Sequence, residues 1–128
     1  MASADLSLLS TEVLDAPVPV VRATGELDLN TAPQLCFAIQ RAATRTRLRP
    51  PRVVIDLVEL DFCDSTGLRA LIGAVREVEV LGGVAVVAAA PEGALDRLLV
   101  LSGLREFLRV ADSAEDALRR LRPTGSAA

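Results

Sequence analysis

The 128-residue chain contains no lysine, histidine, tryptophan or tyrosine, and its 14 basic residues are all arginine. Without histidine, the chain cannot form a Ser-His or Cys-His nucleophile pair or a histidine-ligated metal site. Without lysine, it can form neither a Schiff base nor the phosphate-binding lysine of a Walker-type loop. These absences exclude most catalytic uses of a serine within this chain.

Aromatic residues and cysteines are also scarce. Three phenylalanines are the only aromatic residues, so the core has to be built from the plentiful valine, leucine, isoleucine and alanine. The two cysteines, Cys36 and Cys63, are too far apart in the sequence for a zinc-binding pair. Both are flanked by apolar residues, and we therefore expect two buried, reduced thiols.

The chain also lacks the features of a secreted, membrane-bound or nucleic-acid-binding protein. No basic N-terminal region is followed by an apolar one, and the apolar run at residues 80–90 is too short to span a bilayer. The net charge of −3 gives no reason to expect nucleic acid or an anionic membrane as partner. We expect a cytoplasmic protein. One cluster of basic residues lacks interleaved aromatics and predicts a solvated helix end and loop; its members are Arg41, Arg45, Arg47, Arg49 and Arg52.

The apolar pattern predicts four to five strands and about four helices. Extended runs occur at residues 6–12, 18–27, 53–58, 84–90 and 107–110, and helical spacing occurs at residues 31–43, 68–78, 91–103 and 113–121. Strands and helices that alternate in this way imply a mixed, mostly parallel sheet, here with an N-terminal hairpin that turns near residues 15–17. We predict one α/β domain over residues 1–128, with a core at about 5–122 and a frayed tail at 123–128.

The segment Asp64-Ser65-Thr66-Gly67-Leu68 lies between the strand at residues 53–58 and the next helix. A helix N-terminus presents unpaired N–H groups and the positive end of the dipole, so a phosphate on a hydroxyl there would be well received. Gly67, without a side chain, is expected to keep the approach to Ser65 open. Aspartate, serine and threonine are also favoured N-caps, so the local pattern equally fits a well-capped helix with no further function.

Four short stretches of the sequence, of which this segment is one, together carry a resemblance to a known family. They are residues 24–28 (TGELD) with Thr31 and Ala32, residues 54–57 (VIDL), residues 64–68 (DSTGL) and residues 101–104 (LSGL). In this order and spacing the chain resembles the sulfate transporter and anti-sigma antagonist (STAS) domain family, and within it the stand-alone bacterial anti-sigma factor antagonists. The resemblance covers about residues 5–122 and implies a STAS-like fold and a protein that is not an enzyme.

The resemblance also implies a regulatory site. Ser65 would be phosphorylated by a cognate anti-sigma factor that is itself a serine kinase, with Thr66 as the less favoured acceptor. The unmodified protein would bind the anti-sigma factor and free the sigma factor. The phosphorylated form would release the anti-sigma factor until a serine phosphatase removes the phosphate. ATP and magnesium would be bound by the kinase, and this chain would hold no cofactor or metal. The residues that would flank the phosphosite or contact the partner are Asp28, Thr31, Asp64, Thr66, Gly67 and Leu68.

Two other functions remain open. One is a STAS scaffold or accessory subunit, without switching, in a signalling or lipid-transport assembly. The other is an enzyme in which carboxylates would form a magnesium site; the candidates are Asp56, Glu59, Asp61 and Asp64. Response-regulator receivers place acids similarly but pair them with a lysine that this chain lacks. We expect Glu59 and Asp61 to form a polar loop rim.

Overall fold

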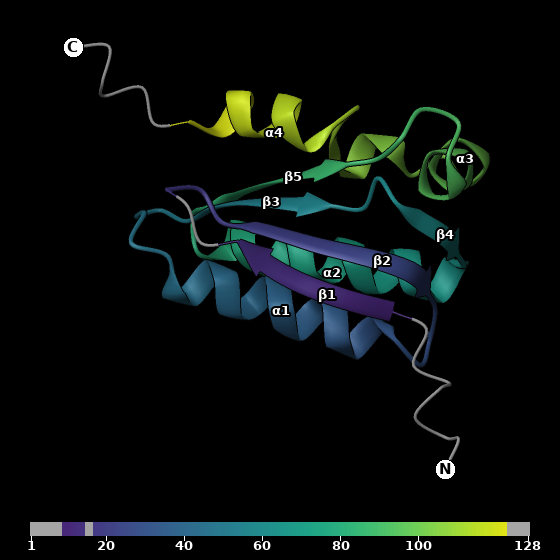
Figure 1. Ribbon diagram of the computed structural model, residues 1–128, viewed down its shortest axis with the longest axis horizontal. Helices are drawn as coiled ribbons and strands as arrows, with labels where there is room; N and C mark the ends of the chain where they lie inside the picture. Colours follow the sequence, from purple (N-terminus) through teal and green to yellow (C-terminus); the bar gives the residue numbers. More distant parts are fainter. Residues whose placement is uncertain (1–8, 15–16, 123–128) are drawn as a thin grey trace.

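A computed structural model describes residues 9–14 and 17–122 of the chain (Figure 1). Its elements, in chain order, are β1 (Leu9–Leu14), β2 (Val20–Leu27), α1 (Ala32–Arg45), β3 (Arg52–Asp56), β4 (Leu60–Cys63), α2 (Ser65–Val80), β5 (Val84–Ala88), α3 (Ala94–Ser102), a 3₁₀ turn (Arg105–Phe107), β6 (Arg109–Ala111) and α4 (Ala114–Leu121). The start of the first predicted strand, most of the predicted hairpin turn and the predicted frayed tail lie outside the described residues.

The strands form one mixed sheet in the order β1-β2-β3-β5-β6, with β4 paired to β2 beyond the end of β3. Strands β1 and β2 pair antiparallel, and every other pair in the described chain is parallel. Helices connect the parallel strands, as such crossovers require. The predicted fold class, a mostly parallel sheet with an N-terminal hairpin and four helices, is confirmed.

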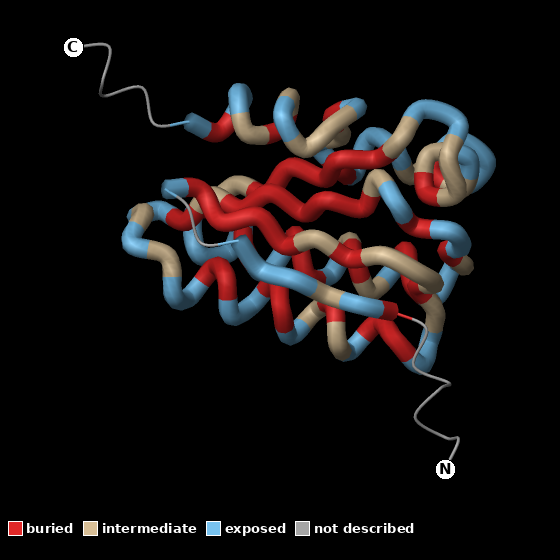
Figure 2. Tube along the Cα trace, viewed as in Figure 1, coloured by how far each residue is buried: buried red, intermediate tan, exposed pale blue. Residues whose placement is uncertain are grey.

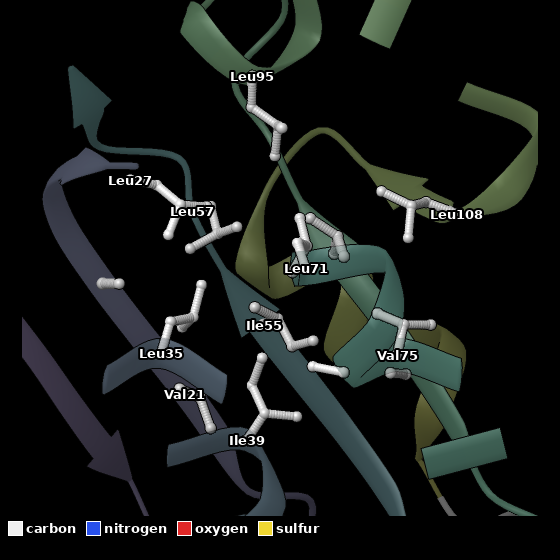
Figure 3. Packing of buried hydrophobic residues seen from close by; sticks show 14 of the residues in the cluster. Val21, Leu27, Leu35, Ile39, Ile55, Leu57, Leu71, Val75, Leu95 and Leu108 are labelled. Atoms are coloured by element: carbon white, nitrogen blue, oxygen red, sulfur yellow. The ribbon is translucent and has the colours of Figure 1, made fainter. Parts of the chain in front are cut away.

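The sheet lies between two helical layers, with α1 and α2 on one face and α4 on the other (Figure 1). Successive side chains of the central strands point to opposite faces of the sheet and so provide buried residues on both. Val53 and Ile55 belong to the core under α1 and α2, whereas Val54 belongs to the core under α4. The tube in Figure 2 shows β3 and β5 buried along most of their length and β1 largely exposed. Aliphatic side chains from β2, β3, α1, α2 and α3 converge on the larger core, as the sequence composition required (Figure 3).

Three local features differ from the sequence-based expectation. Strand β4 was not predicted, and it forms because the second half of β2 offers it a pairing edge. The third helix begins at Ala94 rather than at Pro91, because Glu92 takes a left-handed conformation (φ 63°) and the Gly93 N–H closes a turn onto the Ala90 carbonyl at 2.9 Å. The last strand begins at Arg109, where pairing with β5 starts.

No helix among the described residues is both long enough and apolar enough to cross a membrane.

Candidate functional site

Two neighbouring turns at the carboxyl end of the sheet carry the predicted site. Strands β2 and β4 run parallel and end in register at Leu27 and Cys63. The N–H of Asp64 then donates to the Leu27 carbonyl at 3.2 Å, beyond the last strand pair. The turn that leads into α1 and the turn that leads into α2 therefore lie side by side, at the edge where parallel sheets commonly place binding sites.

Asp28 and Thr31 hold the first of these turns. One Asp28 carboxylate oxygen accepts from the N–H groups of Asn30 (2.9 Å) and Thr31 (3.1 Å). The Thr31 hydroxyl accepts from the Asp28 N–H at 3.0 Å and donates to the Glu26 carbonyl at 2.8 Å. Thr31 is buried, so its part is to stabilise the turn and not to contact a partner directly.

Strand β2 ends at Leu27, where the extended run predicted at residues 18–27 also ends. A bulge interrupts the strand before this end, because the register of β2 against β4 shifts between Gly25 and Glu26. Gly25 adopts φ 109°, a conformation that favours glycine, and such bulges bend a strand. The bend lets β2 pair first with β3 and then with β4, and the turn proper begins only at Asp28.

Asp64 caps α2, which settles which of the three candidate residues has that role. Its carboxylate accepts from the Gly67 N–H at 2.8 Å. Ser65 is the first residue of the helix, and both Ser65 and Thr66 are exposed. No hydrogen bond engages the Ser65 hydroxyl within residues 9–14 and 17–122, so this hydroxyl at the positive end of α2 is not needed to cap it.

Gly67 has a packing role that the sequence did not predict. A Cβ atom on Gly67 would lie 2.6 Å from the Leu27 carbonyl oxygen, so the missing side chain allows α2 to approach the end of β2. Gly67 and Leu68 are both buried and belong to the support of the site rather than to its surface. Of the residues predicted around Ser65, Thr66 is exposed, and Asp28 and Asp64 are half-buried.

Sequence reasoning missed two exposed apolar side chains at this end of the sheet. Leu29, in the turn after β2, is 69% exposed, and Phe62, on β4, is 45% exposed. Exposed apolar residues beside a polar site are typical of protein–protein contact surfaces. The signal for Leu29 was present, because an apolar residue stands alone within a polar turn, whereas the exposure of Phe62 depended on the unpredicted strand β4.

The candidate carboxylates for a magnesium site have different contacts in the structure. Asp56 is buried and accepts from the Arg22 guanidinium at 3.1 Å, and this interaction raises the pKa of Arg22. Glu59 and Asp61 are exposed and line an open hollow of about 660 Å³ beside β1 and β2. Glu59 lies in a loop as expected, whereas Asp61 is part of β4. Across the described residues, no group of three or more acidic or cysteine side chains is placed to hold a metal ion.

The two cysteines are free thiols in different surroundings. Cys63, next to Asp64, is buried as predicted, and burial with the nearby Asp64 charge raises the pKa of its thiol to about 12. Cys36 is only half-buried, contrary to the expectation, and its thiol donates to the Ala70 carbonyl at 3.5 Å, where α1 meets α2. Burial, with a smaller contribution from Glu77, raises the pKa of the Cys36 thiol as well.

We expect the protein to lose stability above pH 9 mainly through Cys63. The unfolded chain releases this thiol proton near the ordinary value of 9.0, whereas the folded protein retains it up to about pH 12. The folded state thus binds more protons in this window, and the free energy of unfolding falls by up to about 1.4 kcal/mol per pH unit. Because the chain has no lysine or tyrosine, few other groups ionise in this pH range.

Urea unfolding from pH 8 to 11 measures this effect. The free energy of unfolding of Cys63→Ala should depend less steeply on pH than that of the unchanged protein. An unchanged slope, or an equal change for Cys36→Ala, would contradict this assignment.

Comparison with known proteins supports the fold and the family. The STAS domain family matches residues 10–117 of the chain. The anti-sigma F factor antagonist of Paenibacillus polymyxa is 32% identical over 105 residues, which cover 81% of this chain and 86% of that protein. The crystal structure of an anti-sigma factor antagonist from Mycobacterium paratuberculosis superposes with a TM-score of 0.75 at 32% identity, covering 90% of this chain and 95% of that one.

A second similar structure is SpoIIAA, a Bacillus cell fate determinant, in its phosphorylated form. It has a TM-score of 0.60 at 25% identity and covers 89% of this chain and 99% of that one. The family match extends from β1 into α4 and includes both turns of the candidate site. The chain therefore belongs to the STAS domain family.

Proposed function

We propose that this protein is a cytoplasmic anti-sigma factor antagonist that is switched by phosphorylation of Ser65. In its unmodified form it binds an anti-sigma factor and so releases a sigma factor, and in its phosphorylated form it does not. The observation that carries the proposal is the exposed Ser65 hydroxyl at the start of α2, free of the capping role that Asp64 fulfils. The anti-sigma factor antagonists among the similar proteins support the same role.

Ser65 is a substrate for another enzyme in this account. The chain contains no histidine or lysine that could activate the hydroxyl as a nucleophile. A kinase can reach the hydroxyl because Ser65 and Thr66 are both exposed at the start of the helix. The phosphorylated structure of the similar protein SpoIIAA fits a modification in a fold of this kind.

The charge around Ser65 explains how phosphorylation would end binding. Carboxylates already gather at this end of the sheet; they are Glu26, Asp28, Glu59, Asp61 and Asp64. A phosphoryl group adds about −1.5 to −2 charge at neutral pH, which repels any acidic group of the partner and is costly to desolvate. Leu29 and Phe62 offer exposed apolar area at the same end of the sheet, so the phosphate would enter a surface from which a partner must exclude water in order to bind.

The proposal is tested by incubating the protein with its anti-sigma factor and ATP and mapping phosphate by mass spectrometry. We expect one phosphate, on Ser65, and none on Ser65→Ala. Thr66→Val serves as the matched control, because it removes the neighbouring exposed hydroxyl and should leave phosphorylation of Ser65 intact. Phosphate on Thr66, or equal labelling of Ser65→Ala, would contradict the assignment of Ser65.

Arg69 is expected to form an ion pair with the phosphate on Ser65. It lies four residues after Ser65 on α2, is exposed, and so shares a helix face with the phosphosite. An exposed ion pair of this spacing contributes roughly 0.5 kcal/mol, so the phosphate of Arg69→Gln should lose its second proton at a pH higher by about 0.4. Phosphorus NMR titration of the phosphorylated protein measures this value, and Arg76→Gln, farther along α2, should leave it unchanged. Equal effects of the two variants would contradict the pairing.

A further inference from the structure

Four arginines line a pocket at the opposite end of the sheet from Ser65. They are Arg52, Arg109, Arg120 and Arg122, and the pocket has a volume of about 360 Å³. Arg52 and Arg109 begin the parallel strands β3 and β6, which flank β5. In Figure 1 this is the end toward which α4 runs, whereas β4 and the start of α2 lie at the other end. The pocket is therefore separate from the candidate phosphosite.

Two of these arginines are held in place by backbone carbonyls. Arg52 donates from Nη1 to the Leu121 carbonyl at 3.1 Å, and Arg120 donates from Nη1 to the Val110 carbonyl at 3.1 Å. Each bond occupies one of the several N–H donors of a guanidinium, so others remain for a ligand. Arg120 also pairs with Asp116 at 3.2 Å, which leaves its guanidinium partly neutralised.

Arg109 and Arg122 have no such structural role in the described part of the chain. Both are exposed, and neither forms an ion pair with a residue that the structure describes. Capping the last carbonyls of α4 accounts for Arg52 but not for these two. Among the described residues, no carboxylate lines the pocket, although the whole chain has a net charge of −3. The overall composition therefore does not explain this concentration of positive charge.

We propose that this pocket binds a small molecule that carries two or more phosphate groups. Guanidinium groups bind phosphate through paired N–H donors, and several converging arginines suit a chain of phosphates better than one anion. Val84 and Val86 add an apolar side to the pocket, and its volume lies within the range of small-molecule sites. This inference goes beyond the proposed switch and does not depend on it.

Titration calorimetry at fixed ionic strength, with inorganic tripolyphosphate and with ATP as probes, tests the proposal. We expect saturable binding at one site, weakened about tenfold or more in the double variant Arg109→Gln, Arg122→Gln. The matched control is the double variant Arg45→Gln, Arg47→Gln, which removes the same charge from exposed positions that do not line the pocket. Equal weakening by both double variants, or no saturable binding of either probe, would overturn the proposal.

Backbone NMR locates the site independently of affinity. Addition of either probe should shift the amide signals of Val84, Val86 and Leu121. Shifts confined to residues 64–69 would place the anion at the start of α2 and would overturn the assignment. Binding of ATP tighter than that of tripolyphosphate identifies a nucleotide-like ligand with a ring against the valines, whereas equal affinity identifies the phosphate chain alone.

Discussion

Replacing Gly67 with alanine is expected to destabilise the protein by about 3 kcal/mol and to lower its Tm by on the order of 10 °C. The new Cβ would lie 2.6 Å from the Leu27 carbonyl oxygen and 2.9 Å from the Leu27 carbonyl carbon. Leu27 cannot easily move away, because its side chain is fully buried and its carbonyl accepts from the Asp64 N–H. The strain therefore falls on the hydrogen bond between the Asp64 N–H and the Leu27 carbonyl, which joins the two turns of the site.

Gly73→Ala is the matched control for this variant, because it makes the same substitution in the same helix. Gly73 is exposed within α2, and a Cβ there would meet nothing within 4 Å. The substitution should therefore stabilise the protein by about 0.5 to 1 kcal/mol through helix propensity. Calorimetry and urea unfolding of both variants measure the difference. A Gly67→Ala protein as stable as Gly73→Ala would show that α2 does not depend on this close approach.

Ser65→Asp is expected to weaken binding of the anti-sigma factor by about a hundredfold, whereas Ser65→Ala should bind as tightly as the unmodified protein. The aspartate places a charge at the exposed start of α2, at the end of the sheet that also carries Asp28, Asp64 and the apolar Leu29 and Phe62. Alanine removes the hydroxyl and leaves the Asp64 cap intact, so the fold should be unchanged. Surface plasmon resonance with the purified partner gives both affinities.

A control for charge alone is Gln40→Glu, on the exposed side of α1 and away from the start of α2. It makes the protein more negative by the same amount as Ser65→Asp, and we expect a change in affinity of about threefold or less. Similar losses in Ser65→Asp and Gln40→Glu would mean that net charge, and not the position of Ser65, governs binding.

The central strands and helices were predictable because their signals are local. Residues 53–55 are continuously apolar and lie in β3, which is buried on both faces, and Leu71, Val75 and Val78 mark the buried side of α2. Strand β4 was not predictable in this way, because it is short and includes the exposed Asp61 and Phe62. Its existence depends on β2 bending at Gly25, a segment distant in the sequence.

The site was predictable in position but not in its internal roles. The sequence located Ser65 at the start of a helix, and the structure places it there. Which of Asp64, Ser65 and Thr66 caps that helix depends on side-chain geometry, since all three residue types are good caps. The role of Gly67 depends on the approach of α2 to β2, a contact between segments that no local pattern records.

The most direct test of the switch compares the affinity of the anti-sigma factor for two preparations of this protein, one unmodified and one carrying a phosphate on Ser65. We expect tight binding of the unmodified protein, binding weaker by about a hundredfold after phosphorylation, and full recovery after phosphatase treatment. Equal affinity of the two preparations, with the phosphate verified on Ser65 by mass spectrometry, would contradict the switch.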